Sequence, residues 1–176
     1  MTTPKYKAAF IDRDGTLIEE VNFLSRVEDM RIFPFTDQSL KQLKKSGYLI
    51  IVVTNQSGIG RGLYTEADMH AIHEAMQAEL GGIIDEFHFC PHLPDTGCEC
   101  RKPNGGMLYS KMGDVDHERS WIIGDKPLDV QTGIDAGIRT AMVMTGYGRD
   151  SIDSMTIEPD IVGEDLLDAV NQILER

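Results

Sequence analysis

The sequence has no long hydrophobic run among its 176 residues. Its longest purely apolar stretch covers residues 48–53, far short of the ~20 residues that a membrane-spanning helix requires. No apolar signal region follows the first residues of the chain. We therefore expect no membrane partner and no export, and the cytoplasm is the expected compartment.

Basic residues are scarce. The chain has 17 Lys and Arg against 29 Asp and Glu, which gives a formal net charge of −12. A surface this negative repels nucleic-acid backbones and anionic membranes. No cluster of Lys and Arg supplies a local basic track, so we expect no nucleic-acid partner and look instead to a small molecule.

Cysteine is also scarce, and its three copies lie in one short segment. Cys90-x-His92, a gap of five residues and Cys98-x-Cys100 place three thiolates and one imidazole within 11 residues. Three thiols cannot all pair within the chain, and their clustering indicates a metal in a reducing compartment. Ligand softness favours Zn²⁺, and four protein ligands leave no open position, so the zinc is expected to be structural. The alternative is three idle cysteines beside a surface histidine.

No repeat, low-complexity tract or linker divides the chain, so we expect a single domain over residues 1–176. Apolar runs alternate with amphipathic segments. The expected strands cover residues 7–11, 48–53, 86–89, 121–123 and 140–144. The expected helices cover 37–47, 65–80, 127–136 and 166–174, and the acidic segment after Arg149 is expected to be a solvated loop.

This alternation predicts an α/β fold: a Rossmann-like three-layer sandwich with a central parallel sheet and helices on both faces. The intervals between the motifs leave no room for a large cap domain. Residues 90–102 are expected to form a short zinc-binding loop, because they contain no apolar periodicity that could build a core. A bound ion would fix the path of this loop and hold Arg101 and Lys102 towards a ligand.

Two carboxylates directly follow the first expected strand, in Asp12-Arg-Asp-Gly-Thr16. Residues i and i+2 of an extended chain point the same way, so Asp12 and Asp14 can face one site. They repel each other unless a cation lies between them, and hard oxygen ligands suit Mg²⁺. The alternative is that the pair only caps the next segment.

Polar residues follow three further strands. The glycine-rich stretch 54–62 could donate neutral hydrogen bonds to a phosphate oxygen, and Arg101 and Lys102 follow the third strand. Asp125 follows the fourth. Each of these alone could be a surface turn, but ligands of parallel sheets bind at the carboxyl ends of the strands. Together they predict a magnesium and phosphate site at that edge.

In this order, the motifs resemble motifs one to four of the haloacid-dehalogenase-like phosphohydrolase superfamily. The matching residues are Asp12-x-Asp-Gly-Thr16, Thr54-Asn55, Lys102 and Gly124-Asp125-x-x-x-Asp129. Within it, the chain resembles the small zinc-containing histidinol-phosphate and D-glycero-D-manno-heptose 1,7-bisphosphate phosphatases. The likeness to the heptose-bisphosphate phosphatases is closer, through residues 55–62, 100–103, 106–107 and 124–126.

The resemblance implies hydrolysis of a phosphomonoester through an aspartyl-phosphate. Asp12 would be the nucleophile, and Asp14 would protonate the leaving alkoxide and then deprotonate the attacking water. Mg²⁺ would be held by the Asp12 carboxylate, the Asp14 backbone carbonyl and the Asp125 carboxylate. Thr54 and Lys102 would bind the phosphoryl group.

The resemblance also implies a small phosphorylated sugar as substrate, the 7-phosphate of a heptose bisphosphate in the pathway to nucleotide-activated heptose and lipopolysaccharide core. The positions that match substrate contacts are Thr54, Asn55, Gln56, Arg101, Lys102 and Lys126. Asp129 is expected to orient its loop rather than bind the metal. Four histidines are expected to be surface or packing residues: His70, His73, His88 and His117. A monomer is expected.

Three other functions stay open. The segment 19–23 would border the sugar, and it departs from the heptose pattern, with Asn22-Phe-Leu24 where the family usually carries Tyr-Val. Phe33-Pro-Phe35 likewise replaces the usual Phe-x-Pro-Gly. The gap between His92 and Cys98 also fits histidinol-phosphate phosphatases.

Polynucleotide 3′-phosphatases resemble the stretch 58–62 as well, but the chain lacks the basic track that they would need. A non-catalytic, zinc-stabilised sugar-phosphate-binding module would bind without turnover. The presence of both Asp12 and Asp14 argues against it.

Overall fold

Six parallel strands form the central sheet of the computed structural model, which describes residues 5–176. The sheet order is β3-β2-β1-β4-β5-β6. The strands are β1 (Lys7–Ile11), β2 (Tyr48–Asn55), β3 (Glu86–Cys90), β4 (Trp121–Gly124), β5 (Arg139–Val143) and β6 (Ile161–Gly163). The central strands are buried on both faces, which explains their unbroken apolar sequences and confirms the α/β prediction.

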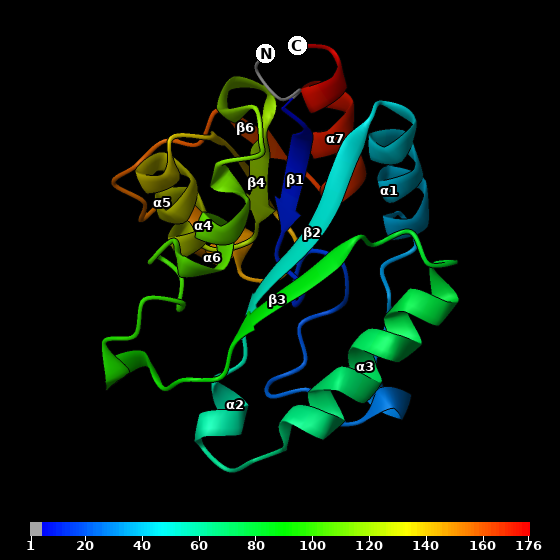
Figure 1. Ribbon diagram of the computed structural model, residues 1–176, viewed down its shortest axis with the longest axis vertical. Coiled ribbons are helices and arrows are strands. Elements are labelled where there is room, and N and C mark those ends of the chain that lie inside the picture. Colours follow the sequence, from blue (N-terminus) through cyan, green and yellow to red (C-terminus); the bar gives the residue numbers. More distant parts are fainter. Residues whose placement is uncertain (1–4) are drawn as a thin grey trace.

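Helices cover both faces of the sheet (Figure 1). On one face lie α1 (Thr36–Lys45), α3 (Glu66–Glu79) and α7 (Leu166–Leu174); on the other lie α4 (Gly106–Met112), α5 (Pro127–Ala136) and α6 (Gly148–Ile152). The short helix α2 (Ser57–Gly60) and 3₁₀ turns at Val27–Asp29, Pro94–Thr96 and His117–Arg119 lie in the connections. Neighbouring strand residues face opposite layers, so Ile11 and Ile123 enter one core while Phe10 and Ile122 enter the other.

The strand order places the functional motifs together. The chain order reverses beside β1, whose Ile11 pairs with Val52 of β2 on one side and Ile123 of β4 on the other. In such sheets ligands bind at the carboxyl ends of the strands that flank the reversal. Those ends point away from the two termini (Figure 1), so Asp12 and Asp125 leave the sheet side by side.

Part of the sequence prediction was wrong. The segment after Arg149 is not a solvated loop: it runs through α6 and then forms β6, the edge strand. Ile161 and Gly163 are buried while Val162 is 45% exposed. Three residues with a single apolar side chain on the buried face give too short a pattern to be recognised.

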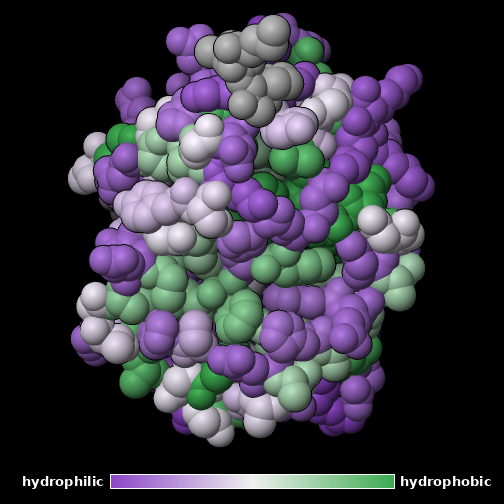
Figure 2. Space-filling view, in the orientation of Figure 1, coloured by the Kyte–Doolittle hydropathy of each residue, from purple (hydrophilic) through white to green (hydrophobic). Residues whose placement is uncertain are grey.

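The connections carry no inserted cap domain in the described chain. Residues 12–35, between β1 and α1, contain one 3₁₀ turn, and residues 91–105, between β3 and α4, contain another. No helix within residues 5–176 combines the length and the apolar character needed to cross a lipid bilayer. Figure 2 shows hydrophilic residues interspersed with hydrophobic ones over the face viewed in Figure 1.

Candidate active site

Asp12 stands immediately after β1, where its backbone N–H donates to the carbonyl of Ile123 at 2.9 Å. Its carboxylate is buried between two ammonium groups: Lys102 Nζ lies 3.0 Å from Oδ1 and Lys126 Nζ lies 3.9 Å from Oδ2. Burial alone would raise the pKa of Asp12, but Lys102 and Lys126 outweigh it and hold that pKa below its ordinary value. Asp12 is therefore an ionised carboxylate at neutral pH.

Lys102 is fixed at both its backbone and its ammonium group. The Asn55 side chain accepts from the Lys102 N–H at 3.0 Å and donates to the Lys102 carbonyl at 3.2 Å. The buried Nζ donates to Asp129 Oδ1 at 2.6 Å and to the Val53 carbonyl at 2.8 Å. Burial opposes the charge, but Asp12 and Asp129 raise the pKa of Lys102 above its usual range. The cation is thus held in one place beside Asp12.

Asp125 carries a buried oxygen without a hydrogen bond. Its Oδ2 accepts from the Tyr147 N–H at 2.8 Å, whereas Oδ1 has only Lys126 Nζ, 3.5 Å away. Burial, and then the charge of Asp12, raise the pKa of Asp125 to about 8. Asp12, Asp125 and Asp129 each offer an oxygen within 4.8 Å of the others. Both Asp129 oxygens already accept hydrogen bonds from Lys102 and Lys126, so Asp12 and Asp125 are the carboxylates that a hard divalent cation would join.

The backbones of two glycines pack against the Asp125 carboxylate. Gly15 and Gly146 have left-handed backbone, with φ of 84° and 54°. A Cβ on either residue would lie 2.3 or 2.1 Å, respectively, from Asp125 Oδ2. Thr145 ties the two loops together by donating from Oγ1 to the Gly15 carbonyl at 2.6 Å. Gly146 follows the fifth expected strand closely, which is the signal that could have identified it from sequence.

Asp14 is held by several donors. Arg13 binds it through both Nε and Nη2 at 3.0 Å, and Gln56 Nε2 donates to Oδ2 at 2.9 Å. Thr54 Oγ1 lies at 3.5 Å from the same oxygen and accepts from Gln56 Nε2 at 2.8 Å. The Asp14 side chain retains 13% exposure, on the wall of the cavity described next.

A cavity of ≈ 190 Å³ brings the sequence-predicted residues together. Those that line it are Asp12, Asp14, Thr54, Asn55, Gln56, Arg101, Lys102 and Lys126. Asp125 is fully buried and does not line the cavity itself, but its Oδ1 lies 3.5 Å from Nζ of Lys126, which does. Asp129 does not line the cavity; it binds Lys102 and accepts from the Lys126 N–H at 3.1 Å, as expected of a residue that orients the loop.

Two further residues of the cavity wall come from the segment 19–23, which was expected to border the sugar with no role given to its individual residues. Glu20 Oε2 pairs with Lys126 Nζ at 3.3 Å, and burial raises the pKa of this glutamate. Phe23, at the cavity rim, has left-handed backbone with φ of 57°, and the Arg61 guanidinium lies 5.5 Å from its ring. Neither residue belongs to a motif, so the sequence placed their segment at the sugar without assigning a role to either residue.

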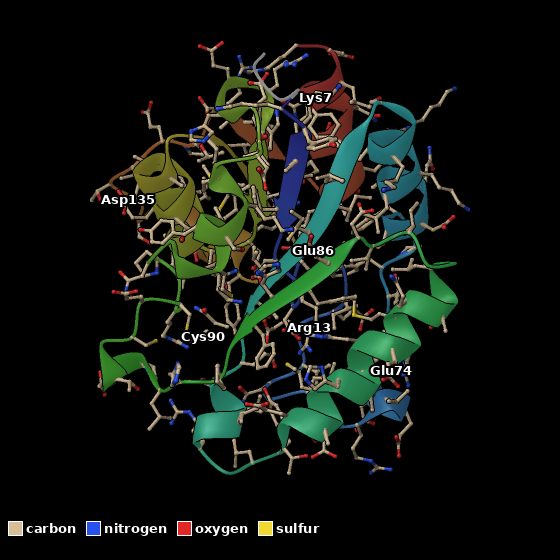
Figure 3. The ribbon with its side chains drawn as sticks, viewed as in Figure 1. Lys7, Arg13, Glu74, Glu86, Cys90 and Asp135 are labelled. Atoms are coloured by element: carbon tan, nitrogen blue, oxygen red, sulfur yellow. The ribbon has the colours of Figure 1, made fainter. Side chains whose placement is uncertain are left out.

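The four predicted zinc ligands converge at the end of β3, where Figure 3 shows Cys90. Their sulfur atoms are separated by 3.1 to 3.7 Å, and His92 Nδ1 lies 3.5 Å from Cys90 Sγ and 3.2 Å from Cys100 Sγ. Tetrahedral zinc with these ligand types needs corners about 3.5–3.8 Å apart. Burial raises the pKa of the Cys90 thiol to about 12, so a cation is required to hold it as thiolate. The residues therefore fit zinc.

The cysteine cluster is joined to the cavity by its own chain. Cys100 stands two residues before Lys102, and Arg101 Nη1 donates to the His92 carbonyl at 3.4 Å. Asn104 Nδ2 donates to the Cys98 carbonyl at 2.8 Å. The path of residues 98–104 is thus set by the cluster.

Comparisons with known proteins agree with this geometry. A family model described as HAD-hydrolase-like matches residues 99–169. The D-glycero-D-manno-heptose-1,7-bisphosphate 7-phosphatase of Thermosynechococcus vestitus is 35% identical over 185 residues, covering 94% of each chain. The D-glycero-beta-D-manno-heptose-1,7-bisphosphate 7-phosphatase of Bordetella bronchiseptica is 34% identical over 177 residues, covering 97% of this chain and 99% of its own.

Solved structures show the same likeness. The D,D-heptose 1,7-bisphosphate phosphatase of B. bronchiseptica, crystallised with magnesium and phosphate, superposes with a TM-score of 0.89 at 33% identity. The match covers 96% of this chain and 98% of that one. The corresponding phosphatase from Burkholderia thailandensis gives a TM-score of 0.74 at 28% identity, over 97% and 99% of the two chains.

Proposed function

Because this chain belongs to the heptose-bisphosphate phosphatases of the haloacid-dehalogenase-like hydrolases, we propose that it removes the 7-phosphate of D-glycero-D-manno-heptose 1,7-bisphosphate. The chain is a phosphatase, a phosphoric monoester hydrolase. The observation that carries the substrate is the whole-chain likeness to a phosphatase of that sugar, 33% identical over 96% of this chain.

The chemistry that we propose uses both aspartates of the first motif. An Asp12 oxygen attacks the phosphorus, the bond from phosphorus to the sugar oxygen breaks, and Asp14 gives its proton to that oxygen. Water then attacks the aspartyl-phosphate and gives a proton to Asp14, which restores Asp12 and releases phosphate. When Mg²⁺ is bound by Asp12, the Asp14 carbonyl and Asp125, it neutralises charge on the phosphoryl oxygens.

Cations and neutral donors hold the phosphoryl group and the sugar. Lys102 is already within hydrogen-bond reach of Asp12, and Thr54 lies on the same wall, so both are proposed to bind the phosphoryl oxygens. Arg101 and Lys126 bring two further cations to the cavity for the substrate. Asn55 and Gln56, the remaining proposed contacts, line the cavity while their amides order Lys102 and Asp14.

The remaining proposals concern the whole chain. Residues 1–176 act as one domain, in which the zinc loop 90–102 is structural. The protein works as a monomer in the cytoplasm and has no nucleic-acid partner. Light scattering at assay concentration tests the monomer, since a mass of two chains would contradict it.

A panel of phosphate-release assays tests the substrate. It compares kcat/KM, with and without Mg²⁺, for both anomers of the heptose 1,7-bisphosphate, histidinol phosphate and a 3′-phosphorylated oligonucleotide. We expect the heptose bisphosphate to give the largest kcat/KM and chelation of Mg²⁺ to abolish it. A larger value for histidinol phosphate would assign that substrate instead, and release from no compound would favour a binding module.

A further inference from the structure

The Asp14 carboxylate is held by a network of hydrogen bonds, parts of which lie outside the four sequence motifs. Arg13 is 1% exposed, yet its guanidinium has no role in the chemistry proposed above. Its position between the carboxyl edge of the sheet and α3 is visible in Figure 3. Two side chains from α3 and from the residues just before it complete the network: His73 and Tyr64.

The first arm runs from His73 through Arg13. Arg13 Nη1 lies 3.2 Å from His73 Nε2, and a guanidinium can only donate, so Nε2 accepts. The ring of His73 is stacked on Phe87 with centroids 4.4 Å apart, which fixes its plane. Arg13 in turn grips Asp14 with Nε and Nη2, both at 3.0 Å. The bidentate pair sets the plane of the carboxylate.

The second arm runs from Tyr64 through Gln56. The Tyr64 hydroxyl donates to Gln56 Oε1 at 2.5 Å, which orients the amide so that Nε2 faces Asp14 Oδ2 at 2.9 Å. Tyr64 itself is locked by packing, since a Cβ on Gly58 would lie 2.1 Å from its ring. Thr54 Oγ1 accepts from Nε2 at 2.8 Å, so the amide is oriented by two hydroxyl groups, of which only that of Tyr64 contacts Oε1.

Together the two arms leave one position on the carboxylate free. A carboxylate has about four lone-pair sites. Asp14 Oδ2 receives Arg13 Nε and Gln56 Nε2, with Thr54 Oγ1 a longer third contact at 3.5 Å, while Oδ1 receives only Arg13 Nη2. The free lone pair is therefore on Oδ1, and that oxygen is the one able to carry a transferable proton.

We propose that His73 and Tyr64 are positioning residues that hold Asp14 with Oδ1 as the oxygen that exchanges protons with the leaving group and with water. This inference rests on the proposed function, in which Asp14 is the general acid and base. A purely structural role explains the network less well, because His73 Nδ1 is buried without a hydrogen-bond partner and Arg13 is a buried cation. Apolar residues of similar volume would stabilise a core as well or better.

The test compares substrates that differ in their need for a general acid. The alkoxide leaving the heptose bisphosphate needs a proton, whereas the 4-nitrophenolate leaving 4-nitrophenyl phosphate does not. kcat/KM reports the step up to release of the alcohol, so it isolates proton donation by Asp14 from the later attack of water. A loss from misfolding lowers kcat/KM for both substrates equally.

The variants are Asp14→Asn, Tyr64→Phe, His73→Phe and His73→Gln. We expect Asp14→Asn to lower kcat/KM for the heptose bisphosphate by about 10²–10⁴-fold and for 4-nitrophenyl phosphate far less. Tyr64→Phe and His73→Phe should show the same selectivity, with losses up to about 100-fold. His73→Gln keeps an acceptor for Arg13 and should restore most of the loss. Tyr109→Phe, at an exposed position that does not line the cavity, is the matched control for Tyr64→Phe and should change neither value.

The outcomes separate the inference from its premise. If Asp14→Asn lowers kcat/KM for both substrates equally, the proposed role of Asp14 is wrong. If Asp14→Asn is selective while Tyr64→Phe and His73→Phe leave the ratio of kcat/KM for the two substrates at the wild-type value, His73 and Tyr64 are not positioning residues. Should His73→Phe fail to fold, Tyr64→Phe decides alone, because it removes a single oxygen and keeps the packed ring.

Discussion

Three neighbouring aspartates, Asp12, Asp125 and Asp129, have the same side chain and different pKa values. Lys102 and Lys126 hold the pKa of Asp12 below its ordinary value despite its burial. Burial raises the pKa of Asp125 to about 8 and that of Asp129 to about 6. Asp12 is thus ready to attack, whereas Asp125 needs a cation to displace its proton. The division of roles comes from neighbours on other strands, which no single motif encodes.

The first prediction concerns His73 and the pH dependence of stability. Burial, and then the charge of Arg13, lower the pKa of His73 from 6.5 to about 3 in the folded protein. Below pH 6.5 the unfolded chain therefore binds a proton at His73 that the folded chain does not bind. The contribution of His73 to stability is fully present above pH 6.5 and is lost as pH falls towards 3. One proton changes the free energy of unfolding by about 1.4 kcal/mol per pH unit.

Urea unfolding of the wild type and of His73→Gln, from pH 7 to pH 4, measures this dependence. We expect the stability of the wild type relative to His73→Gln to fall with decreasing pH, because glutamine does not titrate in this range. Parallel curves for the two proteins would show that His73 takes up its proton equally in both states.

The second prediction concerns Gly146. Alanine there would place a Cβ 2.1 Å from Asp125 Oδ2 and displace the carboxylate. We expect Gly146→Ala to weaken Mg²⁺ binding by about 10-fold or more, since 1.4 kcal/mol is a factor of ten. Gly137→Ala is the matched control: its φ of 69° imposes similar strain, but no atom lies within 4 Å of the added Cβ. Calorimetric titration with Mg²⁺ should separate the two variants, and equal affinities would contradict the contact.

Three motif residues could be predicted from sequence because each stands at the end of a strong apolar strand. Asp12 and Asp125 directly follow β1 and β4, and Thr54 lies in the last residues of β2. The segment 19–23 was expected beside the sugar, but the pairing of Glu20 with Lys126 was not. His73 was expected to be a surface or packing residue, because the spacing of its helix reports only core packing. A histidine on an amphipathic helix gives the same pattern whether or not it contacts Arg13.

Among the elements, the zinc loop has the most direct consequence for function. It contains no core of its own, yet its last ligand, Cys100, stands two residues before Lys102. The loop lies at the lower left of Figure 1, beyond the carboxyl end of β3. Zinc is therefore expected to fix both the loop and the cation that faces Asp12.

The third prediction is that removal of zinc loosens this element. Chelation followed by resupply of Mg²⁺ alone should raise KM and lower the melting temperature. A loss of about 2 kcal/mol would lower Tm by roughly 4–8 °C in a chain of this size. Added Zn²⁺ should restore both values. If metal analysis shows that zinc has gone while KM and Tm are unchanged, the loop does not depend on the ion.

Elements were predictable where their patterns were long. The apolar run of β2 and the capping box of α3, formed by Thr65 and Asp68, are visible in the sequence and present in the structure. The short elements α4, α6 and β6 were missed. They span three to seven residues and none is a continuous apolar run, unlike the equally short β4, whose Trp121-Ile-Ile123 was recognised.

At the scale of the whole molecule, the strand order assembles the site. Alternating patterns predicted a parallel sheet but not the order β3-β2-β1-β4-β5-β6. That order depends on which pairs of strands bury the most surface, a long-range property that periodicity does not report. It brings Asp12 and Asp125, 113 residues apart in sequence, to neighbouring strand ends.

The fourth prediction addresses the central claim that these ends form a phosphatase site in which Asp12 is the nucleophile. Rapid-quench mass spectrometry during turnover of the heptose 1,7-bisphosphate should detect a phosphoryl group on Asp12, dependent on Mg²⁺. Asp12→Asn should abolish both this adduct and turnover, by on the order of 10⁴-fold or more. The exposed Asp135→Asn is the control and should retain both. Steady turnover with no phosphorylated Asp12, or a phosphoryl group on another residue, would contradict the account.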